Sequence, residues 1–239
     1  MLCPRPRAPL LRPLRTLAGL LPLALLAQAP LPGVGVRDHR VLVAADAAPW
    51  DALARLQVPG VARCTAVLVA PRRALTAAHC LWSARLARYV PADMVHVLAR
   101  YQRGAFAGHA RAIRVRIDRA HDVAAVTLDA PIGRAVLGFA PAPAVGTAAM
   151  LGGYNQDRIE VIEADTACRV VADDGPLIRH DCAATHGTSG APLLVRGADG
   201  GWAIAGLQVA AFVRAAGGIA VGGPVLQALL VADTEGDAQ

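Results

Sequence analysis

The sequence predicts an all-β protein, either a barrel or a sandwich. Short apolar runs recur along the chain, and Gly, Pro and Asp, which favour turns, separate them. One run, residues 111–117, alternates apolar and basic side chains with the two-residue period of a strand. Only two segments favour a helix, residues 50–56 after a proline and residues 225–232 further on. Many strands with so little helix favour the all-β class.

The segment 111–117 is the clearest expected strand. It places Ile113, Val115 and Ile117 on one face and two arginines on the other, so we expect one buried and one exposed face. Similar apolar runs predict further strands at residues 61–69, 95–99, 123–128, 160–164, 193–195 and 202–209. Residues 131–146 are rich in Pro, Ala and Gly and are the best candidate for a linker between two halves of similar size.

Residues 1–29 have the organisation of a secretory signal peptide. Four arginines precede the apolar run 17–27, and the small-x-small sequence Ala27-Gln28-Ala29 follows as a candidate cleavage site. The alternative is an uncleaved membrane anchor, but the run falls short of the roughly 20 apolar residues that span a bilayer. We therefore expect an exported protein without a stable membrane span.

The basic character of the chain lies mainly in that N-terminal segment. The formal net charge is +6, but four of the 24 basic residues and none of the 18 acidic residues fall in residues 1–29. The rest of the chain has 20 basic and 18 acidic residues, a net charge of about +2. Its arginines form no basic run and are not interleaved with aromatic residues, so we expect no nucleic-acid partner.

The cysteines fit an oxidising compartment. Cys3 would leave with the signal peptide, and an even set remains: Cys64, Cys80, Cys168 and Cys182. Three disulfide connectivities are possible. The pairing of sequence neighbours, Cys64 with Cys80 and Cys168 with Cys182, is favoured, and each bond would close a loop of about 15 residues and contribute on the order of 3 kcal/mol. Four free thiols in a cytosolic protein are the alternative.

We expect no metal and no cofactor. The sequence has no Cys-x-x-Cys or Cys-x-x-His pair of the kind that binds zinc. Five histidines show no ligand spacing and are expected at surface or hydrogen-bonded positions: His39, His96, His109, His121 and His180.

His79 is a candidate general base. A serine hydroxyl can hydrolyse a peptide bond when a base takes its proton, a carboxylate orients the base and backbone N–H groups stabilise the oxyanion. His79 stands in the segment 75–80, Leu-Thr-Ala-Ala-His-Cys, where small alanines let the backbone turn closely. Together with the segment 64–69, Cys-Thr-Ala-Val-Leu-Val, this segment resembles the signature of the chymotrypsin-like serine proteases.

Ser189 is the candidate nucleophile, within the sequence Gly-Thr-Ser-Gly-Ala-Pro at residues 187–192. This sequence is similar to the Gly-Asp-Ser-Gly-Gly-Pro motif of the same family, in which glycines leave the hydroxyl exposed and let nearby N–H groups point at one spot. The resemblance implies an oxyanion hole formed by the amides of Gly187 and Ser189. The motif follows the histidine motif in the family's order.

Asp122 completes the candidate triad. The family's pattern is an Asp followed by a buried strand, and residues 122–128, Asp-Val-Ala-Ala-Val-Thr-Leu, are similar to it. Asp118 and Asp129 are competitors, but neither begins an apolar run.

The resemblance covers residues 38–222 and is strongest for the bacterial trypsin-like and glutamyl-endopeptidase-like members. Besides the triad motifs it includes Pro49-Trp50, Gly152-Gly153-Tyr154 and the second pair of cysteines. It implies two six-stranded antiparallel β-barrels with a short C-terminal helix. It also implies a monomeric bacterial enzyme, secreted or periplasmic, that hydrolyses protein or peptide substrates without a cofactor.

The resemblance also implies how the two barrels divide the chain. The first would cover residues 38–130 and carry His79 and Asp122. The second would cover residues 141–239 and carry Ser189.

The resemblance assigns the P1 pocket, which receives the side chain before the cleaved bond, to Ala183, Ala184, His186, Gln208, Val209, Ala210 and Ala211. Ala183 would form the floor, where an acidic residue would favour Arg or Lys. Gln208 stands near the place of the His that glutamyl endopeptidases recruit. We therefore expect a small or apolar P1 residue, with His186 as a polar contact at the rim.

One position departs from the pattern of the animal members of the family. Thr188 stands where they have an acidic residue that holds a freshly cut N-terminus, and no Ile-Val-Gly-Gly-type start is visible. Activation by that ion pair is therefore not expected. Removal of the signal or of a short pro-segment before Asp38 is our hypothesis instead.

Two other functions remain as alternatives. A catalytically silent homologue would bind a protein partner on the same scaffold, although such proteins normally lose a triad residue and none is lost here. Another serine hydrolase, such as an esterase, would use a Gly-x-Ser-x-Gly elbow within an α/β pattern, and the sequence lacks both.

Overall fold

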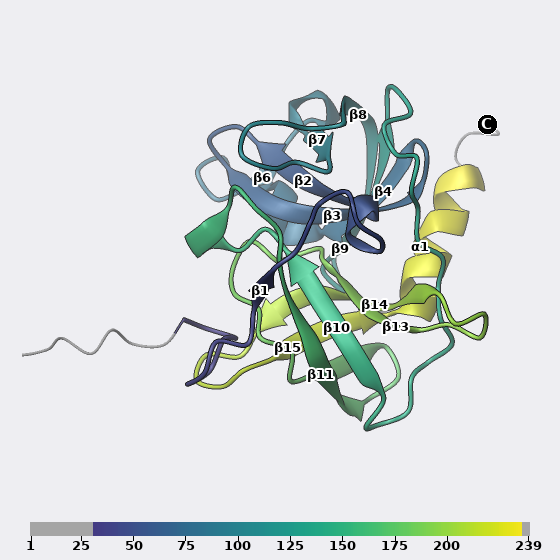
Figure 1. The fold of residues 1–239 in the computed structure, drawn as a ribbon. Coiled ribbons are helices and arrows are strands. Elements are labelled where there is room, and N and C mark those ends of the chain that lie inside the picture. The colour runs from purple at the N-terminus through teal and green to yellow at the C-terminus, as the bar shows by residue number, and fades with distance from the viewer. Residues whose placement is uncertain (1–30, 236–239) are drawn as a thin grey trace, which may run out of the picture.

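The computed structural model describes residues 31–235. The described chain forms two antiparallel β-barrels, one above the other in Figure 1, and one long helix that runs along the side of both. The expected fold of two six-stranded barrels with a C-terminal helix is confirmed. The expected signal peptide lies outside the described residues.

Most of the elements are strands, as the apolar runs predicted. They are β1 Val41–Leu42, η1 Trp50–Ala52, β2 Leu53–Val58, β3 Ala62–Ala70, β4 Arg73–Ala77, η2 Ala78–Leu81, β5 Trp82–Ser83, β6 Arg88–Tyr89, η3 Ala92–Met94, β7 His96–Ala99, β8 Gly108–Asp118, β9 Val123–Leu128, β10 Ala148–Gly153, η4 Gln156–Arg158, β11 Glu163–Asp173, β12 Leu177–His180, β13 Pro192–Arg196, β14 Trp202–Ala211, β15 Gly218–Gly222 and α1 Gly223–Glu235, where η marks a 3₁₀ helix.

The first barrel closes in the order β2-β3-β4-β9-β8-β7, with β7 returning to β2. Alanine is the most frequent residue in its interior, which suits the narrow lumen of a six-stranded barrel. The end of β4 lies beside the start of β9, since Ala77 pairs with Val123. This pairing brings the residues that follow β4 next to those that precede β9.

The second barrel is formed by β10 to β15 and closes through the pairing of β11 with β12. The short strand β1 adds to the outer edge of β11, with Leu42 opposite Glu163. The connection between the barrels, which contains the expected linker 131–146, is bonded to both of them. Leu137 N donates to Leu68 O in the first barrel, and Ala140 N donates to Ile204 O in the second.

The C-terminal helix α1 confirms the helix expected at residues 225–232. It lies against β8 and β9 of the first barrel and against β14 and β15 of the second. Two arginines of the first barrel donate to its carbonyls, Arg73 to Leu230 and Arg116 to Ala232. Within residues 31–235, no helix is both long enough and apolar enough to cross a membrane.

Three local expectations differ from the structure. The strand expected at residues 160–164 begins only at Glu163, as β11, because the 3₁₀ turn η4 and the turn after it occupy residues 156–161. Residues 50–56 form a single 3₁₀ turn, Trp50–Ala52, followed by β2, because β2 is paired on both edges and Leu53 to Leu56 are all buried. Tertiary pairing thus overrides local helix propensity here. Ile113 is 59% exposed, because a β-bulge between Ala112 and Arg114 interrupts the alternation of β8.

The two disulfides join Cys64 to Cys80 and Cys168 to Cys182, which confirms the favoured pairing. The first lies within the first barrel, between β3 and the turn η2 that carries His79. The second lies in the second barrel, between β11 and the segment that follows β12. Each bond therefore holds a segment close to one of the candidate site residues.

One core cluster crosses the boundary between the barrels. It includes Leu53 and Leu75 of the first barrel and Leu194, Leu207 and Val221 of the second, all fully buried. Apolar side chains of both barrels are thus removed from water together, which stabilises their contact.

We expect Leu75→Ala to lower the free energy of unfolding by about 2–5 kcal/mol, because it removes a fully buried side chain from this shared core. Urea denaturation followed by circular dichroism measures the change. Val145→Ala, at a position that is 65% exposed, is the control and should change stability by less than about 0.5 kcal/mol. A loss below about 1 kcal/mol for Leu75→Ala would contradict the shared core.

Candidate active site

The candidate base and carboxylate are neighbours because of the pairing of β4 with β9. His79 follows β4 within the turn η2, and Asp122 directly precedes β9. The backbone N–H groups of Ala78 and His79 both donate to Asp122, the first to its carbonyl at 2.9 Å and the second to Oδ1 at 2.8 Å. Asp122 is thereby bound to the histidine turn through both its backbone and its side chain.

Asp122 holds a left-handed backbone conformation with a φ of +57°. Residues other than glycine rarely adopt this conformation, and in proteins it concentrates at functional sites. The conformation leaves Oδ2 2.6 Å from His79 Nδ1. A carboxylate can only accept, so this contact places the imidazole proton on Nδ1 and leaves the lone pair on Nε2.

Ser189 completes the arrangement from the second barrel. It lies in the connection between β12 and β13, and its Oγ is 2.9 Å from His79 Nε2. With Nε2 as the acceptor, the serine hydroxyl donates to the imidazole. The structure therefore brings together the three residues that the sequence motifs selected, in the order Asp122, His79, Ser189.

Thr65 of β3 forms a hydrogen-bonded junction between the barrels. Its N–H donates to Ser189 O at 3.0 Å, and its hydroxyl donates to Gly187 O at 2.9 Å. The same hydroxyl accepts from Tyr154 N at 2.9 Å, and Thr65 O accepts from the hydroxyl of Thr76 at 2.8 Å. The side chain is fully buried. The loop of Ser189 is thus held directly by the barrel that carries His79.

The amides of Gly187 and Ser189 are available as donors. Within the described part of the chain, neither of these N–H groups donates to a backbone carbonyl. The carbonyl of His186 accepts from Gln156 N at 2.7 Å. In a planar trans peptide the C=O and the following N–H point in opposite directions, so this bond turns the N–H of Gly187 away from Gln156.

Two glycines around the serine are required by close backbone contacts. A Cβ at Gly190 would lie 2.2 Å from Thr65 O, and a Cβ at Gly187 would lie 2.3 Å from Tyr154 O. Both residues have φ values near +90°, a conformation that side chains disfavour. The Gly-x-Ser-Gly sequence is therefore needed to bring this loop against β3 and β10.

A cavity of about 320 Å³ adjoins the triad. It is lined by His79, Thr185, His186, Thr188, Ser189, Gln208, Val209, Ala210 and Ala211. Five of the seven expected pocket residues are among them. The expected floor is not: Ala183 and Ala184 are buried, and Ala183 N donates to Asp165 Oδ2 instead. Thr185 and Thr188, which follow in the same loop, line the cavity.

A buried histidine orients Gln208 in this cavity. His180 Nδ1 accepts from Cys182 N at 3.2 Å, so the ring carries its proton on Nε2, which donates to Gln208 Oε1 at 2.6 Å. Gln208 Nε2 in turn donates to Ala210 O at 2.9 Å. Burial lowers the pKa of His180, which keeps the ring neutral. None of the described residues lining the cavity is Asp, Glu, Lys or Arg.

The other candidates for the carboxylate are bound elsewhere. Asp118 accepts from His121, with Oδ2 2.7 Å from the ring Nδ1. Asp129 accepts from Arg111 N at 3.0 Å. Of the three aspartates, Asp122 is the one that contacts the ring of His79, and its role as the carboxylate stays a prediction.

Metal-ligating atoms converge at two places within residues 31–235. These are Cys64, His79 and Cys80, and Cys168, Asp181 and Cys182. All four cysteines are in disulfides and therefore offer no thiolate. Neither group is suited to hold a metal ion.

Sequence reasoning gave no role to two residues that support the site. Thr65 stands inside the segment 64–69 but carried no signal of its own, and Thr185 lies between two expected pocket residues. His180 was expected at a surface or hydrogen-bonded position, and it is buried and hydrogen-bonded. The contacts of Thr65 are evident only in the folded structure, where β3 lies against the loop of Ser189.

The structure thus has two antiparallel barrels, with Asp, His and Ser in contact at their junction. The family model described as the trypsin-like peptidase domain matches residues 64–200, more than half of the chain. The chain belongs to this family.

The fold is similar to that of a solved structure entitled "Structure of Glu endopeptidase in complex with MPD". The TM-score is 0.71 at 21% sequence identity, and the match covers 84% of this chain and 99% of the other. None of the curated proteins matches the sequence.

We expect Thr65→Val to lower the free energy of unfolding by about 1–3 kcal/mol, because it leaves the partly buried Gly187 carbonyl and the buried Tyr154 N–H without their partner. Urea denaturation measures the loss. The matched control is Thr185→Val, since the buried hydroxyl of Thr185 has no partner among the described residues and its removal should not destabilise. Equal effects of the two substitutions would rule out the junction.

Proposed function

We propose that the protein is a serine endopeptidase that hydrolyses peptide bonds through an acyl-enzyme. The observation that carries this proposal is the contact chain from Asp122 through His79 to Ser189, with distances of 2.6 Å and 2.9 Å. Membership of the trypsin-like peptidase family supports the same activity.

The first half of the reaction forms the acyl-enzyme. His79 Nε2 takes the proton of the Ser189 hydroxyl while Oγ attacks the peptide carbonyl carbon, and the carbonyl electron pair moves to the oxygen. The amides of Gly187 and Ser189 donate to that oxyanion. When the oxygen pair returns, the C–N bond breaks, and the proton on His79 goes to the leaving amine.

The second half returns the enzyme to its starting state. Water gives its proton to His79 and adds to the acyl carbon, and the ester bond to Ser189 then breaks as His79 returns the proton to Oγ. Asp122 stays a carboxylate throughout and holds the imidazole in one tautomer.

The proposed setting is an oxidising compartment, secreted or periplasmic. The two disulfides support it, because such bonds persist outside the reducing cytosol. The proposed partners are protein or peptide substrates, and the proposed working form is a monomer.

The proposed P1 residue is small or apolar. A charged side chain in the cavity would meet no Asp, Glu, Lys or Arg among its described lining residues, and burying an unpaired charge is unfavourable. The amide of Gln208 carries no charge. It is hydrogen-bonded through both its oxygen and its nitrogen, which holds the side chain in place.

We expect a fluorophosphonate probe to label the protein at Ser189 and to fail with Ser189→Ala and His79→Ala, because the hydroxyl needs the imidazole as its base. Asp122→Asn should lower kcat on the order of 10⁴-fold, because the amide can hold the imidazole in the wrong tautomer. Mass spectrometry of the labelled peptide and a peptide-amide assay measure these effects.

Asp129→Asn, outside the site, is the control and should label normally. Labelling that persists in Ser189→Ala would contradict the role of Ser189. No labelling of the unchanged protein would contradict the proposal and favour a silent scaffold. Activity on peptide esters without any activity on casein would favour an esterase instead.

We expect a P1 library to yield small and apolar residues, with kcat/KM for Arg, Lys or Glu at P1 lower by at least about tenfold, because the described cavity lining has no Asp, Glu, Lys or Arg. Peptides differing only at P1 and assayed at one ionic strength provide the comparison. A profile dominated by Arg, Lys or Glu would overturn the proposed specificity.

A further inference from the structure

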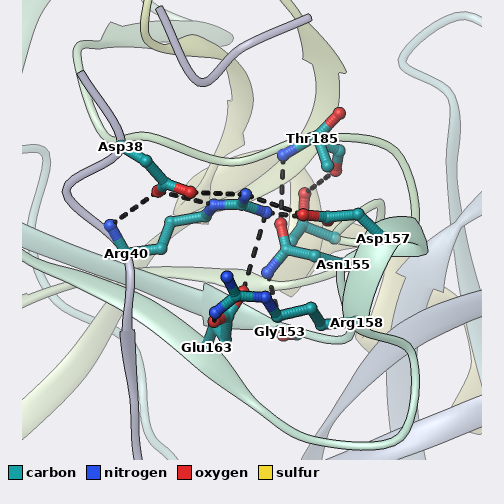
Figure 2. Close-up of polar contacts among 9 residues, drawn as sticks. Asp38, Arg40, Gly153, Asn155, Asp157, Arg158, Glu163 and Thr185 are labelled. Carbon is teal, nitrogen blue, oxygen red and sulfur yellow. Dashed lines mark hydrogen bonds and ion pairs between the residues drawn. The ribbon is translucent and has the colours of Figure 1, made fainter. Parts of the chain in front are cut away.

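A buried arginine fixes the N-terminal segment to the loop behind the serine. The side chain of Arg40 is 1% exposed and lies between Asp38 and Asp157, as Figure 2 shows. It binds both carboxylates through two hydrogen bonds each, at 2.8–2.9 Å. The planar guanidinium is suited to such paired contacts, which a lysine cannot reproduce.

The charges around Arg40 are nearly balanced. Two arginines, Arg40 and Arg158, face three carboxylates, those of Asp38, Asp157 and Glu163. The hydrogen bonds from Arg40 lower the pKa of Asp38 and of Asp157. Glu163 Oε2 is buried without a hydrogen-bond partner among the described residues and lies 3.8 Å from Arg40 Nη1. Loss of Arg40 would thus leave buried negative charge poorly compensated.

Asp157 belongs to the loop 155–158, which touches the serine loop directly. Asn155 Oδ1 accepts from Thr185 N at 3.1 Å, as Figure 2 shows, and Gln156 N donates to His186 O at 2.7 Å. Asn155 is almost fully buried and also donates to Gly153 O. The loop therefore holds two consecutive residues of the segment that leads to Ser189.

The bond from Gln156 is the one that directs the N–H of Gly187, because the peptide between His186 and Gly187 is planar. Any shift of the loop 155–158 would turn that peptide and with it the donor to the oxyanion. The carboxylate of Asp157 is one residue further along, and Arg40 holds it from the N-terminal side. The contacts run without a gap from Arg40 to Gly187.

We propose that Arg40 is a positioning residue that holds the loop 155–158 and thereby aligns the oxyanion donor of Gly187. This inference rests on the proposed serine endopeptidase function. Arg40 touches neither the triad nor the cavity lining, so its effect is exerted through Asp157 and Gln156. The side chain of Thr188 has no charge, and its hydroxyl donates to Thr185 O, so it supplies no competing ionic anchor for the loop of Ser189.

We expect Arg40→Lys to lower kcat for a peptide amide by about 10- to 100-fold with KM changed less than about threefold, because the oxyanion donor acts mainly in the transition state. Rates are divided by the concentration of sites titrated with the fluorophosphonate, so unfolded protein does not contribute. Asp157→Asn should act in the same direction. The double variant should be no worse than the poorer single variant, since both break one contact chain.

The matched control is Arg179→Lys, which alters an exposed ion pair with Asp174 and should leave kcat and KM unchanged. Amide hydrogen exchange of residues 183–190, measured by mass spectrometry, gives a readout that needs no activity. It should be faster in Arg40→Lys and unchanged in Arg179→Lys, because the bonds of the loop 155–158 to this segment are loosened.

A kcat per titrated site within twofold of the unchanged protein in both Arg40→Lys and Asp157→Asn would overturn the inference. If the unchanged protein neither reacts with the probe nor cleaves peptides, the proposed function fails, and hydrogen exchange alone decides the role of Arg40. In that case faster exchange at residues 183–190 supports it and unchanged exchange rejects it.

Discussion

The register between the two barrels at Thr65 is the constraint on which the site depends. His79 and Asp122 belong to one barrel and Ser189 to the other, so their geometry is only as accurate as the contact between barrels. The shared apolar core holds the barrels together but is not directional. The bonds from Thr65 to Ser189 and Gly187 are directional, and they fix the serine loop relative to the histidine turn.

The N-terminal segment, which lies outside the strands of the second barrel, binds the loops of that barrel next to the cavity. Gly33 O accepts from both Ala184 N and Gly217 N at 3.0 Å, and Gly33 N donates to Phe212 O at 2.6 Å. A Cβ at Gly33 would lie 1.9 Å from Ala184 O, so the contact needs glycine. The N-terminal segment therefore joins the two sides of the cavity through its backbone, and the ion pairs of Arg40 anchor the same segment a few residues later.

Sequence reasoning succeeded where the signal is local. The candidate triad residues, which stay a prediction, stand inside short motifs, two glycines near Ser189 are required by close backbone contacts, and the disulfides join neighbours in sequence. It failed where distant pairing decides, as for β2, which reads as a helix, and for Ile113, which a bulge turns outward. Arg40 and Asp157 are 117 residues apart, so no local pattern marks them.

The cavity and the contacts of Arg40 that hold the loop 155–158 differ in their charged residues. Around Arg40, five charged groups compensate one another and fix backbone segments, and two of them, Arg40 and Glu163, are buried. The described lining of the cavity has no Asp, Glu, Lys or Arg, and the buried His180 that bonds to Gln208 is kept uncharged by burial. Protonation of His180 would place a second N–H against the N–H of Cys182, so the neutral tautomer is also the one that its bonds require. Hydrogen bonds between His180, Gln208 and Ala210 thus shape the pocket, and its described lining has no acidic side chain to pair with an Arg or Lys of a substrate.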